Sequence, residues 1–173
     1  MVATPSRFAT LMPSRHTEID LSEIGQYPML KAMVDFWQQA SGESLPRRIE
    51  PFDVPKKLMP YVMLLDLETE PECLRVRLAG TEVCAKHGGE LRSKTTNDFF
   101  LEDDAQAVVD AAKLAASTRK PTLARREYVG LDDRMWGYVR LILPLSSDGV
   151  KVDRFFKAIE PATLREFRAA SRG

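Results

Sequence analysis

Several short stretches of the chain alternate apolar and polar residues, as strands do when one face of a sheet is buried. Leu74, Val76 and Leu78 alternate with Arg75 and Arg77. Because successive side chains of a strand point to opposite faces, this spacing places the apolar set on one face and the arginines on the other. The pattern predicts a half-buried β-strand.

Glycines after this strand indicate a short helix. Gly80 ends the strand, Thr81 is a suitable helix cap, and the pair Gly88 and Gly89 breaks the helix. Upstream, residues 61–67 are apolar at nearly every position, which is typical of a strand that is covered on both faces. We therefore expect other elements on both sides of the sheet.

An amphipathic helix is predicted over residues 28–40. Pro28 suits its first turn and Gly42 its end. Its apolar residues recur at helical spacing, and they are Leu30, Met33, Val34, Trp37 and Ala40. This stripe either packs on its own domain or meets a second copy of the chain, and the sequence leaves both open.

A second helix begins at Asp103 or Asp104. Acidic residues favour the positive end of the helix dipole, so the run 102–104 is interpreted as capping rather than as catalytic carboxylates. The small residues of its buried stripe favour close packing on a sheet. The stripe comprises Ala105, Val108, Val109, Ala112, Ala115 and Ala116.

Three strands are predicted after this helix, over residues 122–129, 135–143 and 150–159, with polar turns typical of antiparallel hairpins. Pro161 then opens a C-terminal helix that carries Leu164 and Phe167. The elements together predict an α+β fold, with an antiparallel sheet of about five strands and the N-terminal helix on its outer face. The chain divides into a flexible or extended arm (1–25) with an apolar clip at Ile19, Leu21 and Ile24, the amphipathic helix (26–43), the main domain (44–160) and the C-terminal helix (161–173).

Length and charge narrow the class of protein. The 173 residues suffice for one domain, and 25 basic residues balance 25 acidic ones. This neutrality argues against a nucleic-acid binder. With no apolar run of membrane-spanning length and no signal-peptide pattern, we expect a cytoplasmic protein. Cys73 and Cys84 lack metal or redox spacing and are interpreted as reduced packing residues.

The sequence offers no catalytic or metal site. His87 lies beside Gly88 and is interpreted as a solvated turn residue, and His16 lies in the arm. A lone histidine is a poor metal site, since metals commonly take three or four protein ligands. The pair Arg125 and Arg126 either recognises an anion or an acidic partner, or belongs to an exposed strand edge.

The order strand, strand, short helices, longer helix and three strands resembles the PAS fold. More narrowly, residues 45–160 resemble a bacterial subfamily of single-domain PAS proteins, the PAS-5 type. The matching motifs are Leu45-Pro46-Arg47-Arg48 through Asp53, Leu58-Met59-Pro60, Tyr61 to Asp66, Arg77-Leu78-Ala79-Gly80-Thr81, Gly89-Glu90-Leu91 and Pro144-Leu145 before Asp148-Gly149. Ser93, where such chains often have glycine, departs from the pattern of that turn.

The resemblance implies signal transduction without catalysis, through ligand sensing or partner docking, with the output passed to another protein. The sequence around Cys84 does not resemble a photoactive flavin site, and residues 102–118 contain no histidine for haem. No cofactor is therefore expected.

A small apolar ligand would contact the inward side chains, although these are equally consistent with a filled core. The expected wall comprises Met63, Leu65, Val76, Leu78, Phe99, Phe100, Val109, Val139 and Leu141. A homodimer interface is hypothesised where exposed aromatic residues and arginine are typical anchors. It comprises Leu30, Met33, Val34, Trp37, Trp136, Tyr138 and Arg140, unless the helix around Trp37 covers the sheet of its own chain.

An alternative function is that of a small enzyme with a cone-shaped α+β fold, such as an isomerase or cyclase. Such an enzyme needs an acid or base that points inward. The inward positions assigned above are nearly all aliphatic, and the order of elements also argues against this alternative.

Overall fold

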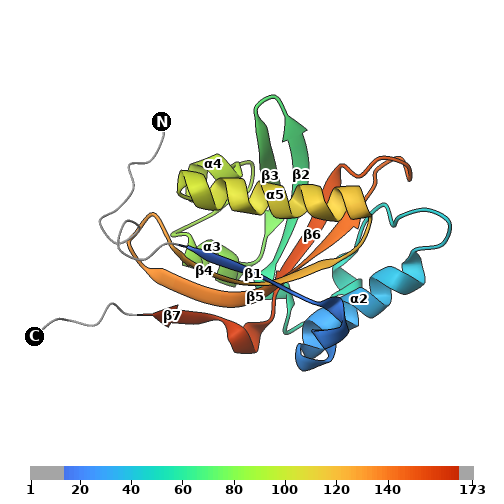
Figure 1. Ribbon diagram of the computed structural model, residues 1–173, viewed down its shortest axis with the longest axis horizontal. Coiled ribbons are helices and arrows are strands. Elements are labelled where there is room, and N and C mark those ends of the chain that lie inside the picture. Colours follow the sequence, from blue (N-terminus) through green and yellow to red (C-terminus); the bar gives the residue numbers. More distant parts are fainter. Residues whose placement is uncertain (1–13, 168–173) are drawn as a thin grey trace, which may run out of the picture.

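The computed structural model describes residues 14–167, which form one antiparallel sheet with helices on both faces (Figure 1). The strand order is β1-β4-β5-β6-β2-β3, and β7 pairs with β5. The strands are β1 (Arg15–Ile19), β2 (Val62–Thr69), β3 (Glu72–Ala79), β4 (Thr122–Val129), β5 (Met135–Leu145), β6 (Arg154–Ile159) and β7 (Arg165–Phe167). The helices are α2 (Pro28–Ala40), α3 (Thr81–Lys86), α4 (Thr96–Phe99) and α5 (Glu102–Thr118), and short 3-10 turns span Leu21–Gln26, Pro51–Asp53, Met59–Tyr61 and Pro161–Thr163.

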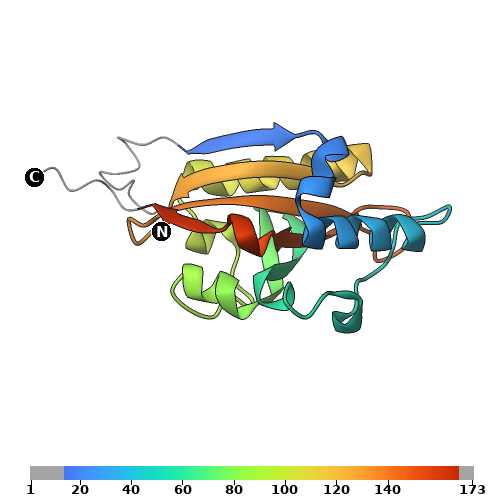
Figure 2. The same cartoon turned by 90° about the horizontal axis from the view of Figure 1, so that it is seen from below.

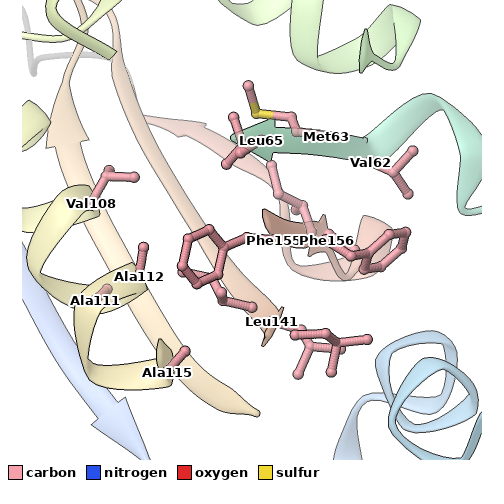
Figure 3. Packing of buried hydrophobic residues seen from close by; sticks show 14 of the residues in the cluster. Val62, Met63, Leu65, Val108, Ala111, Ala112, Ala115, Leu141, Phe155 and Phe156 are labelled. Carbon is pink, nitrogen blue, oxygen red and sulfur yellow. The ribbon is translucent and has the colours of Figure 1, made fainter. Parts of the chain in front are cut away.

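The sheet has an inner face, covered by α5, and an outer face, part of which is covered by α2. In Figure 3 the ring of Phe155 turns toward α5 while the ring of Phe156 turns the opposite way. Ala112 and Ala115 are fully buried, and their small side chains let α5 approach the sheet closely. Figure 2 shows α2 beyond the end of the long strands, away from α5.

Helix α2 is fixed to the sheet by its start and by its apolar stripe. The carboxylate of Glu160, just after β6, accepts hydrogen bonds from the backbone N–H groups of Met29 and Leu30 at 3.4 and 3.0 Å. These N–H groups have no partner within the helix, so Glu160 acts as a remote cap. Near the other end, Trp37 Nε1 donates to the carbonyl of Pro144 at 2.8 Å.

Two additional strands extend the expected sheet of five. β1 arises within the predicted N-terminal arm and pairs with β4, while Ile19, Leu21 and Ile24 pack against the core as expected. Residues 1–13 of that arm lie outside the described part of the chain.

The prediction of a C-terminal helix is wrong for residues 161–167, where a 3-10 turn leads into β7. The physical reason lies in Gly137 of β5. A side chain there would collide with the ring of Phe167, since an added Cβ would lie 2.6 Å from Phe167 Cε2. Glycine therefore leaves room for Phe167 to seat on this stretch of β5, and Arg165–Phe167 pairs with Met135–Gly137. Residues 168–173 lie outside the described part of the chain.

Gly80 marks a second close backbone approach, at the end of β3. Its N–H donates to the carbonyl of Val62 at 2.8 Å, and an added Cβ would lie 2.3 Å from the carbonyl oxygen of Pro60. The strand-ending glycine predicted from sequence is therefore also required by packing, because a methyl group would meet rigid backbone.

Candidate functional site

The register of the late strands determines which side chains face inward. Directly paired residues of an antiparallel sheet share a face. Lys157 of β6 pairs with Ile142 of β5 and with Met63 of β2, and it lies two residues from the inward-facing Phe155. Lys157 therefore points to the inner face, although the residues on either side of it, Phe156 and Ala158, are apolar.

The same register places the polar side of β5 inward. Tyr138 and Arg140 share the face of Ile142, since the three residues are spaced two apart in β5, and Tyr138 pairs with Arg126 of β4. Two pairs further along, and so on the same face, Trp136 lies opposite Tyr128. The inner face of β4, β5 and β6 therefore carries cations and aromatic rings where the sequence interpretation placed aliphatic residues.

Lys86 completes this group from the opposite side. It is the last residue of α3, and its side chain is buried. Its Nζ lies 4.6 Å from the centroid of the Tyr128 ring and 5.0 Å from that of Tyr138, and it donates a hydrogen bond to the Tyr128 hydroxyl. We call Lys86, Arg126 and Lys157 the inner basic cluster.

The inner basic cluster has little negative charge to balance it. In the described part of the chain, Asp104 is the buried carboxylate that forms an ion pair with it, 3.6 Å from Arg126 Nη2. Both Nη atoms of Arg126 and the Tyr138 hydroxyl are buried without a hydrogen-bond partner among residues 14–167. Unpaired buried polar groups are costly, and a bound ligand, a water molecule or a loss of charge would lower this cost.

The proton affinities of the cluster reflect its burial. Loss of solvation, followed by repulsion from Arg126, holds the pKa of both Lys86 and Lys157 well below the usual value of 10.5. Burial also raises the pKa of Asp104, although the nearby Arg126 acts in the opposite direction. In the absence of a ligand the site therefore favours neutral lysines.

His87 lies at the edge of the cluster, so its interpretation as a solvated turn residue is wrong. Its ring packs edge-on against Phe99 and Phe100, with centroids 4.9 and 5.0 Å apart, and its Nε2 lies 3.1 Å from Lys86 Nζ. Burial and the adjacent Lys86 lower the pKa of His87 to about 2. A neutral imidazole therefore faces the lysine.

A cavity of about 10 Å³ lies where α3 meets the sheet, and Lys86, His87, Tyr138 and Lys157 contribute to its wall. This volume corresponds to roughly one water molecule. Ammonium groups and a phenol O–H are hydrogen-bond donors. The arrangement therefore suits a small anion more than a neutral or apolar molecule.

Arg140 lies further along the same face and has neutral partners. Its guanidinium donates to the carbonyl and hydroxyl of Thr122 at 3.2 and 3.1 Å, and it lies 2.7 Å from His16 Nε2. Burial lowers the pKa of Arg140 to about 9. Burial and the nearby charge of Arg140 lower the pKa of His16 to about 4. His16 therefore accepts this hydrogen bond as a neutral imidazole.

The structure divides the expected ligand wall between the two faces of the sheet. Met63, Leu65 and Val76 point inward as expected. Leu78, Val139 and Leu141 belong to the outer face, because they share the register of Phe156. Phe99, Phe100 and Val109 are buried beside the inner face, where Phe100 packs against Tyr128. The expected wall is therefore corrected, and cations occupy part of it.

The expected interface residues are all buried within one chain. Leu30, Met33, Val34 and Trp37 face the sheet of their own chain, which is the first of the two alternatives stated for this helix. Trp136, Tyr138 and Arg140 point inward rather than outward. These seven side chains offer no exposed interface in this conformation, and the homodimer itself stays a prediction.

Sequence reasoning missed Lys86 and Lys157. It named Arg126 as one of a pair that either recognises an anion or lies on an exposed strand edge, and it interpreted Asp104 as a helix cap. The signal available was a charged residue within an otherwise buried run, as at Lys157 between Phe156 and Ala158. Arg125, by contrast, is exposed. Of the pair at 125–126, only Arg125 therefore has the exposure expected of a strand edge.

Other kinds of site receive no support from the described residues. Within residues 14–167 no three His, Cys, Asp or Glu side chains could hold a metal together. No helix in the same range is long and apolar enough to cross a membrane. Cys73 and Cys84 are free thiols.

Comparison with known proteins gives one match. The family model described as PAS domain matches residues 26–160, which include α2 and every strand from β2 to β6. No curated protein and no solved structure matches the chain.

Proposed function

Because this chain belongs to the PAS domain family, a family of sensory and signalling modules, we propose that it senses a small anion at the inner basic cluster and passes the signal to a partner protein. The observation that carries the proposal is the burial of three basic side chains, of which Arg126 forms an ion pair with the buried carboxylate of Asp104, while no described carboxylate pairs with Lys86 or Lys157. The anion replaces the small apolar ligand that the sequence suggested.

Burial of unbalanced cations is expensive, and the protein can reduce this cost in two ways. Lys86 and Lys157 can release their protons, or an anion can bind and stabilise their charged forms. The two are linked, because an anion that favours the charged lysines draws protons onto them. Anion binding is therefore expected to be tighter at lower pH, with uptake of protons.

The position of Lys86 suggests how binding leads to an output. Lys86 ends a helix of six residues, while Arg126 and Lys157 lie on central strands of the sheet. A bound anion attracts the short helix toward the sheet. A shift of α3 and of the turn that follows changes the surface offered to a partner. We expect this to take place in the cytoplasm, where free thiols stay reduced.

Titration followed by NMR tests the proposal. Sodium chloride, nitrate and acetate, compared at constant ionic strength with neutral acetamide, should shift the backbone amide signals of α3. Lys157→Met should weaken anion binding at least tenfold, whereas Lys56→Met, at an exposed lysine outside the site, should leave it unchanged. Equal shifts with acetamide, or no weakening in Lys157→Met, would refute the proposal.

One observation favours the enzyme alternative, because it removes a reason that was given against it. The inner face is not aliphatic, since Lys86 lies there 3.1 Å from His87 and Asp104 pairs with Arg126, which removes one reason given against this alternative. However, Asp104 is already paired with Arg126. The family and the order of elements favour a sensory module, so we retain a non-catalytic role.

A further inference from the structure

A groove of about 230 Å³ lies at the end of the sheet where the connector before β2 crosses β2, β3 and β6. Its walls combine residues from segments far apart in the sequence. Arg47 and Arg48 come from the connector, Arg77 from β3 and Arg154 from β6. The fold thus gathers four guanidinium groups around one depression in a chain whose net charge is zero.

Several of these arginines have guanidinium N–H groups without a hydrogen-bond partner among the described residues. Arg77 and Arg154 share one carboxylate, Asp66, at 3.5 and 3.8 Å, and neither makes a side-chain hydrogen bond to another described residue. Arg47 is exposed and has neither an ion pair nor a side-chain hydrogen bond among residues 14–167. Arg48 is paired with Glu50 at 2.6 Å.

Arginines elsewhere on the surface are engaged differently. Arg134 contacts both carboxylate oxygens of Glu166, and Arg75 binds Glu68 through two nitrogens and also donates to the carbonyl of Ser93. The four guanidinium groups of the groove, by contrast, have two carboxylates as ion-pair partners among residues 14–167, Glu50 and Asp66. Guanidinium forks that lack such partners match incoming carboxylates, which they can bind through two hydrogen bonds each.

The groove also has an apolar component. Ile49, Leu145 and Phe155 are buried in its wall, and Leu64 is half-buried there. Phe52, the residue after the lining residue Pro51, is 85% exposed. Aromatic residues and arginines are enriched among the anchors of protein interfaces.

We infer that this groove docks an acidic segment of a partner protein, with carboxylates on the arginines and an apolar side chain against Phe52. The inference rests on the proposed function in one respect, since the groove is the surface through which the signal would pass to a partner protein. The groove and the inner basic cluster share strands. Leu65 and Phe155 line the groove, and Met63 and Lys157, two residues away in each strand, line the cavity.

Peptide binding tests the inference with the full chain. The probe is a short fluorescein-labelled peptide of glutamates interrupted by leucines, and the matched probe carries glutamine at every glutamate. Fluorescence anisotropy should show binding of the acidic probe that weakens as salt is added, because surface charges are screened. Arg47→Glu combined with Arg48→Glu should weaken binding at least tenfold, and Phe52→Ala should weaken it severalfold.

Arg92→Glu is the control, since it makes the same change at an exposed arginine outside the groove. It should change the affinity less than twofold. No binding of the acidic probe, equal binding of the glutamine probe, or equal loss in Arg92→Glu would overturn the inference. Self-association through the groove, detected as a dimer that the Arg47→Glu, Arg48→Glu variant abolishes, would also overturn it.

Failure of the groove can be distinguished from failure of the proposed function. The Arg47→Glu, Arg48→Glu variant should retain the chloride and acetate shifts of α3 seen by NMR, because its substitutions lie outside the inner basic cluster. Loss of peptide binding with those shifts intact supports the groove. If the wild-type protein binds anions normally but does not bind the acidic probe, the docking inference is refuted and the proposed anion site is not.

Discussion

At the scale of single residues, the binding role proposed for Lys157 conflicts with stability. It occupies a position on β6 that an apolar side chain would fill, between Phe156 and Ala158 and opposite Ile142. Positions that serve binding often lower the stability of the fold. The cost of burying this cation should therefore be measurable.

We predict that Lys157→Met stabilises the protein at neutral pH. Methionine has a similar length without the charge, and replacing buried ionic groups by apolar ones of similar volume often stabilises by about 1–4 kcal/mol. Urea unfolding monitored by circular dichroism gives the difference in free energy. A clear loss of stability in Lys157→Met would mean that the ammonium group is already well paired, which contradicts our description of the site.

We also predict that the wild-type protein loses stability as the pH falls from about 10 to about 7 in buffers without small anions. The pKa of Lys86 and of Lys157 is lowered by folding, so the unfolded chain binds protons that the folded chain does not. Lowering the pH through this window therefore favours the unfolded chain. Unfolding free energies measured across the range should show a smaller slope in Lys157→Met, and an identical slope would contradict the assignment.

Sequence alone could identify this site only in part. The alternation in β5 correctly separated Val139 and Leu141 from Tyr138 and Arg140. It could not say which set faces α5, because both faces of β5 are buried. Assigning the aliphatic set inward followed the general preference of cores for apolar residues, and here the inner face is where the cations gather.

At the scale of elements, α2 was predicted with its observed bounds, Pro28–Ala40, because proline, apolar spacing and the following glycine agree. The strand after Pro161 could not be predicted. Three residues carry little periodicity, and the pairing of β7 depends on Gly137, which lies far away in the sequence. Long-range packing decided this element.

We predict that Glu160→Ala loosens the attachment of α2. Glu160 accepts hydrogen bonds from the backbone of Met29 and Leu30, and removing it leaves buried N–H groups without a partner. Hydrogen bonds to charged groups contribute about 1.5–3 kcal/mol, so a loss of this order is expected in urea unfolding. Hydrogen exchange should become faster in the first turn of α2. Unchanged exchange there would show that the cap is dispensable.

We predict that Gly80→Ala disrupts the junction between β3 and α3. Its Cβ would lie within 2.4 Å of the carbonyl oxygens of Pro60 and Met59, and backbone cannot move aside cheaply. Overpacking typically costs about 1–3 kcal/mol, and α3 should shift with its Lys86. The matched control is Gly42→Ala, at a glycine with no atom within 4 Å of an added Cβ. Equal stability of the two variants would contradict the close approach.

At the scale of the whole molecule, the fold was predictable because its elements follow the order of the PAS domain, and the family match over residues 26–160 confirms that order. The two ends of the sheet were not predictable, since β1 and β7 add strands that depend on tertiary pairing. The charge of the site was hidden for a related reason. A chain with no net charge can still bury several cations together, and only the register of the strands reveals it.

We expect an anion to enter the inner basic cluster together with protons. Isothermal titration calorimetry with the tightest of the three anions, in two buffers of different ionisation enthalpy at about pH 8, tests it most directly. We predict different heats in the two buffers that correspond to net proton uptake, and a much smaller uptake in Lys157→Met. Equal heats in both buffers, or no binding of any of the three anions, would contradict the account.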